Sequence, residues 1–239
     1  MNPVAATHLH GSHRLRPSAA GVEARLALLG LMMKARLRAG VAGGEAVAVG
    51  TGAALEPDDR LCAPRRFVGA HLAADLYERC PRRVGAASSA PDLVTIAAGM
   101  ALAPGERDGA VATIASEDAL GTDAWTTALR LVRELAAPLV LVVDRVVPHG
   151  RPLTQAPPPG SLPLIGEAVD GAHLEDVLDA VAAACERTRS GGGPAVVLCV
   201  RRGAPSEAPF AARLDPIERY ARSLLGAGAP RERIEAALR

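Results

Sequence analysis

The chain has 239 residues and almost balanced charge, with 27 lysines and arginines against 26 aspartates and glutamates. This balance excludes a general electrostatic attraction to nucleic acid or to an anionic membrane, and an aromatic content of 2% excludes a base-stacking platform. No apolar stretch approaches the ~18 residues of a membrane span, and the first residues lack the apolar core of a signal peptide. The four cysteines have no C-x-x-C spacing, which favours neither a zinc site nor a disulfide framework, so we expect a cytoplasmic protein.

Residues 1–20 show no hydrophobic period and contain three histidines in the run HLHGSH. These histidines could bind a metal, but a flexible N-terminal tail is the simpler interpretation. Residues 21–239 have the length of a single domain with a sizeable core. The first helix is expected at 22–38, where apolar residues keep helical spacing at Val22, Leu26, Leu29, Met33 and Leu37.

The stretch 109–147 predicts a strand, a polar turn, a helix and a second strand. Residues 111–115 are a short apolar run typical of a buried strand. Asp123 is the expected N-cap of the following helix, and Pro138 ends that helix. Residues 139–143 then form an uninterrupted aliphatic run, which suits a strand covered on both faces of a parallel sheet.

One segment of interest follows each of these two strands. Ser116, Glu117 and Asp118 form the turn after the first strand, and residues 144–147 follow the second. In open α/β sheets, ligands bind outside the carboxyl ends of the strands. A cofactor would therefore be expected at residues 116–121 and 144–147.

Three further segments carry a family resemblance. They read GGEAVAVG at 43–50, IAAGMALA at 96–103 and DPIERY at 215–220. Together with the central stretch, they resemble the α subunit of the E1 component of 2-oxo acid dehydrogenases, in the right order from Val22 to Arg239. The resemblance implies a thiamine diphosphate-binding fold, which is an α/β fold with a mostly parallel sheet and helices on both faces.

The resemblance also implies a cofactor site. In that family Mg²⁺ carries thiamine diphosphate, and an aspartate after one strand and an asparagine after the next hold the metal. Here Glu117 stands for the aspartate, between Ser116 and Asp118, while Arg145 and Val146 stand for an asparagine pair. Glu117 is therefore the candidate metal ligand, and the other residues except Val146 are candidate cofactor contacts. Mg²⁺ requires octahedral oxygen ligation, which a valine side chain cannot supply.

Arg65 and Arg66 occupy the segment with which the family grips the terminal phosphate, and Arg66 matches the family arginine. An arginine fork suits phosphate, so an anion site and a solvated basic turn are both open interpretations. Val68 stands where the family has a histidine at the reacting centre, and valine cannot transfer a proton. His71 follows three residues later and is more simply a surface histidine. We therefore assign no catalytic residue.

The scaffold motifs are kept, while the site motifs are replaced and two active-site loops are shortened. We expect a catalytically degenerate E1 α-like subunit, a structural or regulatory partner of an E1 β-like chain in a heterotetramer of two α and two β subunits. A lipoyl-bearing E2 component is a further candidate partner. The alternatives are an active subunit, which decarboxylates a 2-oxo acid oxidatively and transfers the acyl group to lipoyl, and a stand-alone diphosphate- or nucleotide-binding protein. The weakly aromatic, Ala-rich core favours an interface on the small-residue helices.

Overall fold

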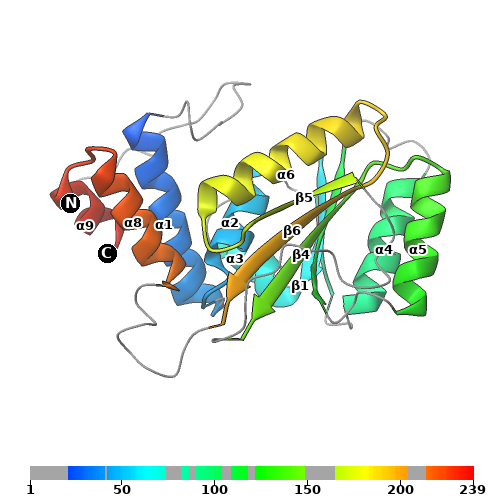
Figure 1. Cartoon of the computed structure of the whole chain (residues 1–239), viewed down its shortest axis with the longest axis horizontal. Helices are drawn as coiled ribbons and strands as arrows, with labels where there is room; N and C mark the ends of the chain where they lie inside the picture. The colour runs from blue at the N-terminus through cyan, green and yellow to red at the C-terminus, as the bar shows by residue number, and fades with distance from the viewer. Residues whose placement is uncertain are drawn as a thin grey trace.

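The computed structural model describes residues 21–40, 42–73, 82–86, 90–103, 109–117, 122–148, 165–203 and 214–239. The tail expected at 1–20 and the candidate contact Asp118 lie outside these residues. The described chain forms three layers, with a parallel sheet between two layers of helices (Figure 1). No helix in these ranges is both long enough and apolar enough to cross a membrane.

The helices and strands alternate along much of the chain. The described helices are α1 (Val22–Ala39), α2 (Glu45–Ala54), α3 (Arg65–Ala73), α4 (Ala90–Leu102), α5 (Asp123–Glu134), α6 (Leu174–Arg189), α8 (Pro216–Gly226) and α9 (Arg231–Ala237). The described strands are β1 (Arg60–Pro64), β2 (Arg82–Ala86), β3 (Val111–Ser116), β4 (Leu139–Val147), β5 (Ile165–Asp170) and β6 (Ala195–Arg202).

The strands of the described chain form one sheet in the order β2-β1-β3-β4-β6-β5, and every neighbouring pair is parallel. Along this strand order, the chain moves in one direction from β1 to β2 and from β5 to β6. It moves in the opposite direction from β2 to β3 and from β3 to β4. Because such crossovers are right-handed, α3 and α6 cover one face and α4 and α5 cover the opposite face. The expectation of a parallel sheet with helices on both faces is confirmed.

Each face of the sheet buries its own core. Side chains of β4 alternate between the two cores, as the period of a strand requires. Val140 and Val142 join the core under α1, α2, α3, α6, α8 and α9, which we call the α2 face. Leu139, Leu141 and Val143 join the core under α4 and α5, which we call the α4 face.

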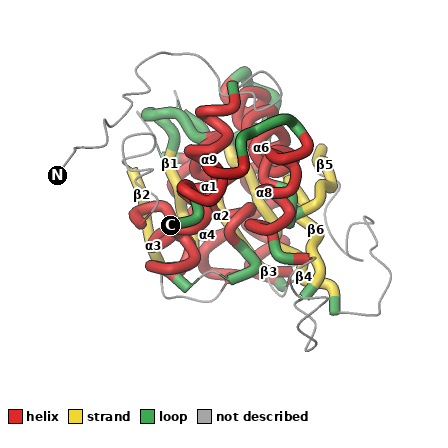
Figure 2. The backbone as a smooth tube through the Cα atoms, turned by 90° about the vertical axis from the view of Figure 1, so that its left-hand side faces the viewer, coloured by secondary structure: helices red, strands yellow, loops and turns green. Residues whose placement is uncertain are grey.

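Helix α2 lies at the centre of the α2 face, and every residue from Glu45 to Ala53 is buried. Its small side chains allow close packing, since a Cβ added at Gly50 would lie 2.9 Å from Cγ1 of Val177 in α6. Figure 2 shows α1, α8 and α9 grouped on the outer side of this face. Helix α8 begins as the sequence predicts, because Asp215 accepts hydrogen bonds from two backbone N–H groups of the first turn and Pro216 follows it.

Two expectations for the central stretch are wrong in detail. The N-cap of α5 is Thr122, whose Oγ1 accepts a hydrogen bond from the backbone N–H of Trp125 at 3.2 Å, and Asp123 is the first helical residue. Threonine and aspartate are both good caps, so the sequence alone does not separate these neighbours. Strand β4 continues to Val147 because its pairing with β6 extends to Arg202. Residues 144–147 therefore belong to the strand and do not follow it.

Candidate functional site

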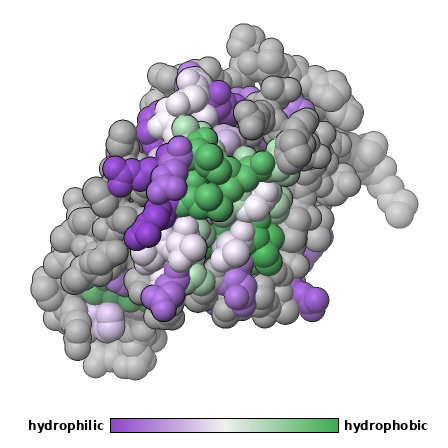
Figure 3. Space-filling model, turned by 90° about the vertical axis from the view of Figure 1, so that its right-hand side faces the viewer, coloured by the Kyte–Doolittle hydropathy of each residue, from purple (hydrophilic) through white to green (hydrophobic). Residues whose placement is uncertain are grey.

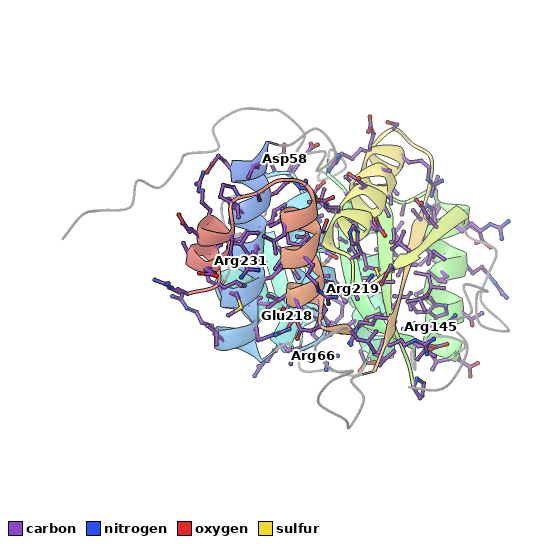
Figure 4. The ribbon with its side chains drawn as sticks, turned by 60° about the vertical axis from the view of Figure 1, so that its left-hand side comes forward. Asp58, Arg66, Arg145, Glu218, Arg219 and Arg231 are labelled. Carbon is purple, nitrogen blue, oxygen red and sulfur yellow. The ribbon has the colours of Figure 1, made fainter. Side chains whose placement is uncertain are left out.

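The strand order creates a switch point between β1 and β3. The chain leaves β1 through α3 on the α2 face, whereas it leaves β3 through α5 on the α4 face and in the opposite direction. Ligands of open α/β sheets bind at such a reversal, outside the carboxyl ends of the strands. The candidates after β1 and β3, and Arg145 near the end of β4, lie along this carboxyl edge. Figure 4 shows Arg66 and Arg145 at the lower side of the molecule.

Arg65 and Arg66 open α3 directly after β1, and both are exposed. The guanidinium carbon of Arg66 lies 5.0 Å from the centroid of the ring of Phe67, which is buried. A positive charge in the first turn of a helix opposes the helix dipole, which favours anions there. This arrangement is compatible with both the anion site and the solvated basic turn.

Glu117 and Arg145 meet across the ends of β3 and β4. Strand alternation directs Arg145 to the α4 face, two residues after Val143. Oε1 of Glu117 lies 3.0 Å from Nη2 of Arg145, and the Arg145 side chain is only 6% exposed against 41% for Glu117. A nearly buried guanidinium requires a counter-charge, and Glu117 supplies one. The predicted metal ligand is therefore bound to a cation of the chain itself.

Asp144 and Arg201 form a second ion pair, on the α2 face. Nε of Arg201 donates to Oδ1 of Asp144 at 2.7 Å, and Nη2 donates to Oδ2 at 2.9 Å. This two-point geometry is the strong form of the arginine–carboxylate pair. Burial alone would lower the pKa of Arg201, but the hydrogen bonds to Asp144 and the charges of Asp144 and Glu45 raise it above its ordinary value. Both oxygens of Asp144 are thus engaged.

Arg36 of α1 forms ion pairs with two carboxylates, one in α2 and one at the N-cap of α8. Its Nε donates to Oε1 of the fully buried Glu45 at 2.5 Å, and its Nη2 lies 2.8 Å from Oδ2 of Asp215. Burial would lower the pKa of Arg36, but the two carboxylates raise it. Glu45 also accepts a hydrogen bond from the backbone N–H of Gly43 at 3.1 Å. The ion pairs of Arg36 with Glu45 and Asp215 therefore tie α1, α2 and α8 together on the α2 face.

Sequence reasoning places Asp144 in the segment 144–147, where a cofactor is expected, and gives no role to Arg201. Each follows an aliphatic run, and a charged residue at the end of a buried strand is a usable local signal. Their partnership depends, however, on the register between β4 and β6, in which Asp144 pairs with Cys199. Local sequence does not contain that register.

The other candidates lie apart from the Glu117–Arg145 pair. Ser116 is half-buried and lies opposite Asp144 in the register of β3 and β4, so strand alternation directs it to the α2 face. Val68 is partly buried and packs against the core of that face. The side chain of His71 is outside the described residues. The structure thus brings Glu117 and Arg145 together and separates Ser116 from them.

The residues at this edge do not fit the Mg²⁺ that the family resemblance implies. Glu117 is bound to Arg145, and Val146, which is 44% exposed, has no side-chain oxygen. In the described part of the chain there is no group of three or more His, Cys, Asp or Glu side chains that could hold a metal. Because Mg²⁺ needs near-ideal octahedral oxygen ligation, this donor set does not supply a site for the cofactor's metal.

Comparison with known proteins does not assign the chain. No protein-family model matches it, and no curated protein matches it significantly. The resemblance to E1 α subunits therefore rests on the sequence motifs.

Proposed function

We propose that the chain is a cytoplasmic E1 α-like subunit of a 2-oxo acid dehydrogenase-type assembly, with a thiamine diphosphate-binding fold. It acts as a structural or regulatory partner of an E1 β-like chain and not as a catalyst. The observation that carries this proposal is the 3.0 Å ion pair between Glu117 and Arg145, at the place where an active subunit presents a carboxylate to Mg²⁺. Val68, which stands in place of a catalytic histidine, supports the same conclusion.

Exposed apolar side chains on α4 and α5 support a role in assembly. Figure 3 shows apolar side chains gathered on the side of the molecule that carries these two helices. Ile96, Leu131 and Leu135 are exposed, and a Cβ added at Gly99 would meet no atom within 4 Å. Contiguous exposed apolar residues mark protein interfaces, and an outward glycine lets another helix approach closely. We assign this α4–α5 surface to the E1 β-like partner.

The two alternative functions would use different residues at the carboxyl edge of the sheet. An active E1 α subunit would need Glu117 to exchange Arg145 for Mg²⁺, with backbone or water oxygens replacing the asparagine and the partner supplying acid–base groups. A stand-alone diphosphate- or nucleotide-binding protein would use the exposed Arg65 and Arg66 at the start of α3. The active subunit requires a rearrangement of the ion pair, whereas the binding protein does not.

The assembly is tested by co-expressing the chain with the E1 β-like protein of the same genome and measuring the mass of the complex by light scattering after size-exclusion chromatography. We expect a heterotetramer of two α and two β subunits. Ile96→Glu on the α4–α5 surface should weaken the complex by about tenfold or more, because it places a charge in an apolar interface. Leu37→Glu is the matched control, since Leu37 is exposed on α1. A chain that stays separate from a folded E1 β-like protein would contradict the proposal.

Cofactor binding is tested by isothermal titration of thiamine diphosphate with Mg²⁺ into the purified complex. We expect no magnesium-dependent binding. Micromolar, magnesium-dependent binding that is lost in Glu117→Ala would identify an active subunit instead. Magnesium-independent binding of diphosphate by the chain alone, lost in Arg66→Ala, would identify a stand-alone binding protein.

A further inference from the structure

The ends of β3 and β4 hold opposite charges in contact. Glu117 follows the last residue of β3, and Arg145 lies near the carboxyl end of β4. The distance of 3.0 Å between Oε1 of Glu117 and Nη2 of Arg145 is that of a charge-assisted hydrogen bond. A metal ion bridging these two strand ends would lie in the same position, between the Glu117 carboxylate and the end of β4.

We propose that the Arg145 guanidinium takes the place of a divalent cation between the ends of β3 and β4. The Glu117 carboxylate is thus neutralised by a cation of the chain itself and does not take up Mg²⁺. The inference rests on the proposed function for one point only, which is that a metal ion would be expected at this position. The ion pair itself is independent of that expectation.

The burial of the two partners supports this substitution. The Arg145 side chain is only 6% exposed on the α4 face, so its guanidinium occupies the space beside Glu117 that an ion would need. A divalent ion on Glu117 would stand within a few ångströms of that guanidinium and would be repelled by it. Mg²⁺ would also need further oxygen ligands, and the next residue, Val146, offers none from its side chain.

The substitution changes the chemistry of the edge. A guanidinium satisfies a carboxylate with planar N–H donors, but it has no open coordination position for a diphosphate oxygen or a water molecule. It also cannot be removed by a chelator. The structural link between β3 and β4 is thereby retained, while the Lewis-acid chemistry of a metal ion is lost.

The test is a titration of Mn²⁺, followed by electron paramagnetic resonance, into the full chain and its variants. We expect no one-to-one Mn²⁺ binding by the wild-type chain and no effect of a chelator on its unfolding temperature. Arg145→Gln frees the Glu117 carboxylate, places an amide oxygen beside it and should gain Mn²⁺ affinity by about tenfold or more. The gain should disappear when Glu117→Gln is added. Arg133→Gln, an exposed arginine of α5, is the matched control and should gain nothing.

One-to-one Mn²⁺ binding by the wild-type chain that is lost in Glu117→Gln would overturn the inference. So would an Arg145→Gln variant that folds and gains no Mn²⁺ affinity. If that variant is too unstable for titration, we expect Mn²⁺ to raise its unfolding temperature, and no rise would also overturn the inference. Complex formation with the E1 β-like chain is measured separately, so failure of the proposed function leaves the Mn²⁺ result intact.

Discussion

The strongest stability prediction concerns Asp59, which is fully buried at the turn before β1. Its Oδ1 accepts hydrogen bonds from Nε of Arg189 at 3.0 Å and from the backbone N–H of Ala110 at 2.7 Å. Its Oδ2 accepts from Nη2 of Arg189 at 2.5 Å and from the backbone N–H of Glu56 at 2.8 Å. Burial would lower the pKa of Arg189, but the hydrogen bonds and charge of Asp59 raise it, so the guanidinium stays charged. One carboxylate thus joins the start of β1, the entry to β3 and the end of α6.

Asp59→Ala should therefore lower the free energy of unfolding by about 3–5 kcal/mol, the usual cost of removing one partner from a buried ion pair. For a chain of this length, that corresponds to a fall of roughly 6–20 °C in the unfolding temperature. Glu56→Gln is the control, because Glu56 contacts Arg189 at 3.1 Å from an exposed position and should cost about 0–1 kcal/mol.

The measurement is urea unfolding of both variants, with Asp59→Ala combined with Arg189→Ala in a double-mutant cycle. We expect a coupling energy of about 2 kcal/mol or more between Asp59 and Arg189. A loss below about 1 kcal/mol for Asp59→Ala, or no coupling in the cycle, would refute the reasoning that this pair holds the three elements together.

Three further predictions can be checked by urea unfolding. Gly50→Ala should lower the free energy of unfolding by about 1–3 kcal/mol, because the new Cβ would lie 2.9 Å from a side-chain atom of α6. Gly99→Ala faces open space on α4 and should raise the free energy of unfolding by about 0.5–1 kcal/mol. Equal effects of the two substitutions would contradict the packing argument. Burial raises the pKa of the Cys62 thiol from 9.0 to about 11, so in this pH range the folded chain keeps a proton that the unfolded chain loses. The free energy of unfolding should therefore fall between about pH 9 and pH 11. The fall should be less steep in Cys62→Ala. Tyr220→Phe removes a 3.3 Å hydrogen bond to Glu175 and should cost about 0.5–1.5 kcal/mol, and no measurable loss would show that this bond adds nothing.

Local pattern predicts much of the fold. The run at 139–143 lies in β4, and the helix expected at 22–38 is α1, which spans Val22–Ala39. The pattern does not reveal that β6 inserts between β4 and β5, because that order depends on contacts between distant segments. The same pairing lengthens β4 to Val147, which places Arg145 inside a strand.

The candidate site shows the same limit. Glu117 and Arg145 can be singled out from the sequence as separate candidates, but their contact is set by the alignment of β3 with β4, in which Ser116 pairs with Asp144. Ser116 and Glu117 are neighbours in the chain, yet strand alternation directs Ser116 to the α2 face, while Glu117 contacts Arg145 on the α4 face. The metal ligand that the family resemblance implies, Glu117, is therefore one partner of an ion pair in the structure.

The packing of α1 against α8 and α9 bears on how the chain folds during its synthesis. Glu23 of α1 pairs with Arg233 of α9, and a Cβ added at Gly30 of α1 would lie 3.6 Å from the carbonyl oxygen of Ala237. Residues 40–215 separate α1 from α8, and a ribosome that adds ~5–20 residues per second needs about 9–35 s to make them. During that time α1 lacks part of its apolar cover, so the nascent chain depends on its last helices, or on a chaperone, to hide that surface.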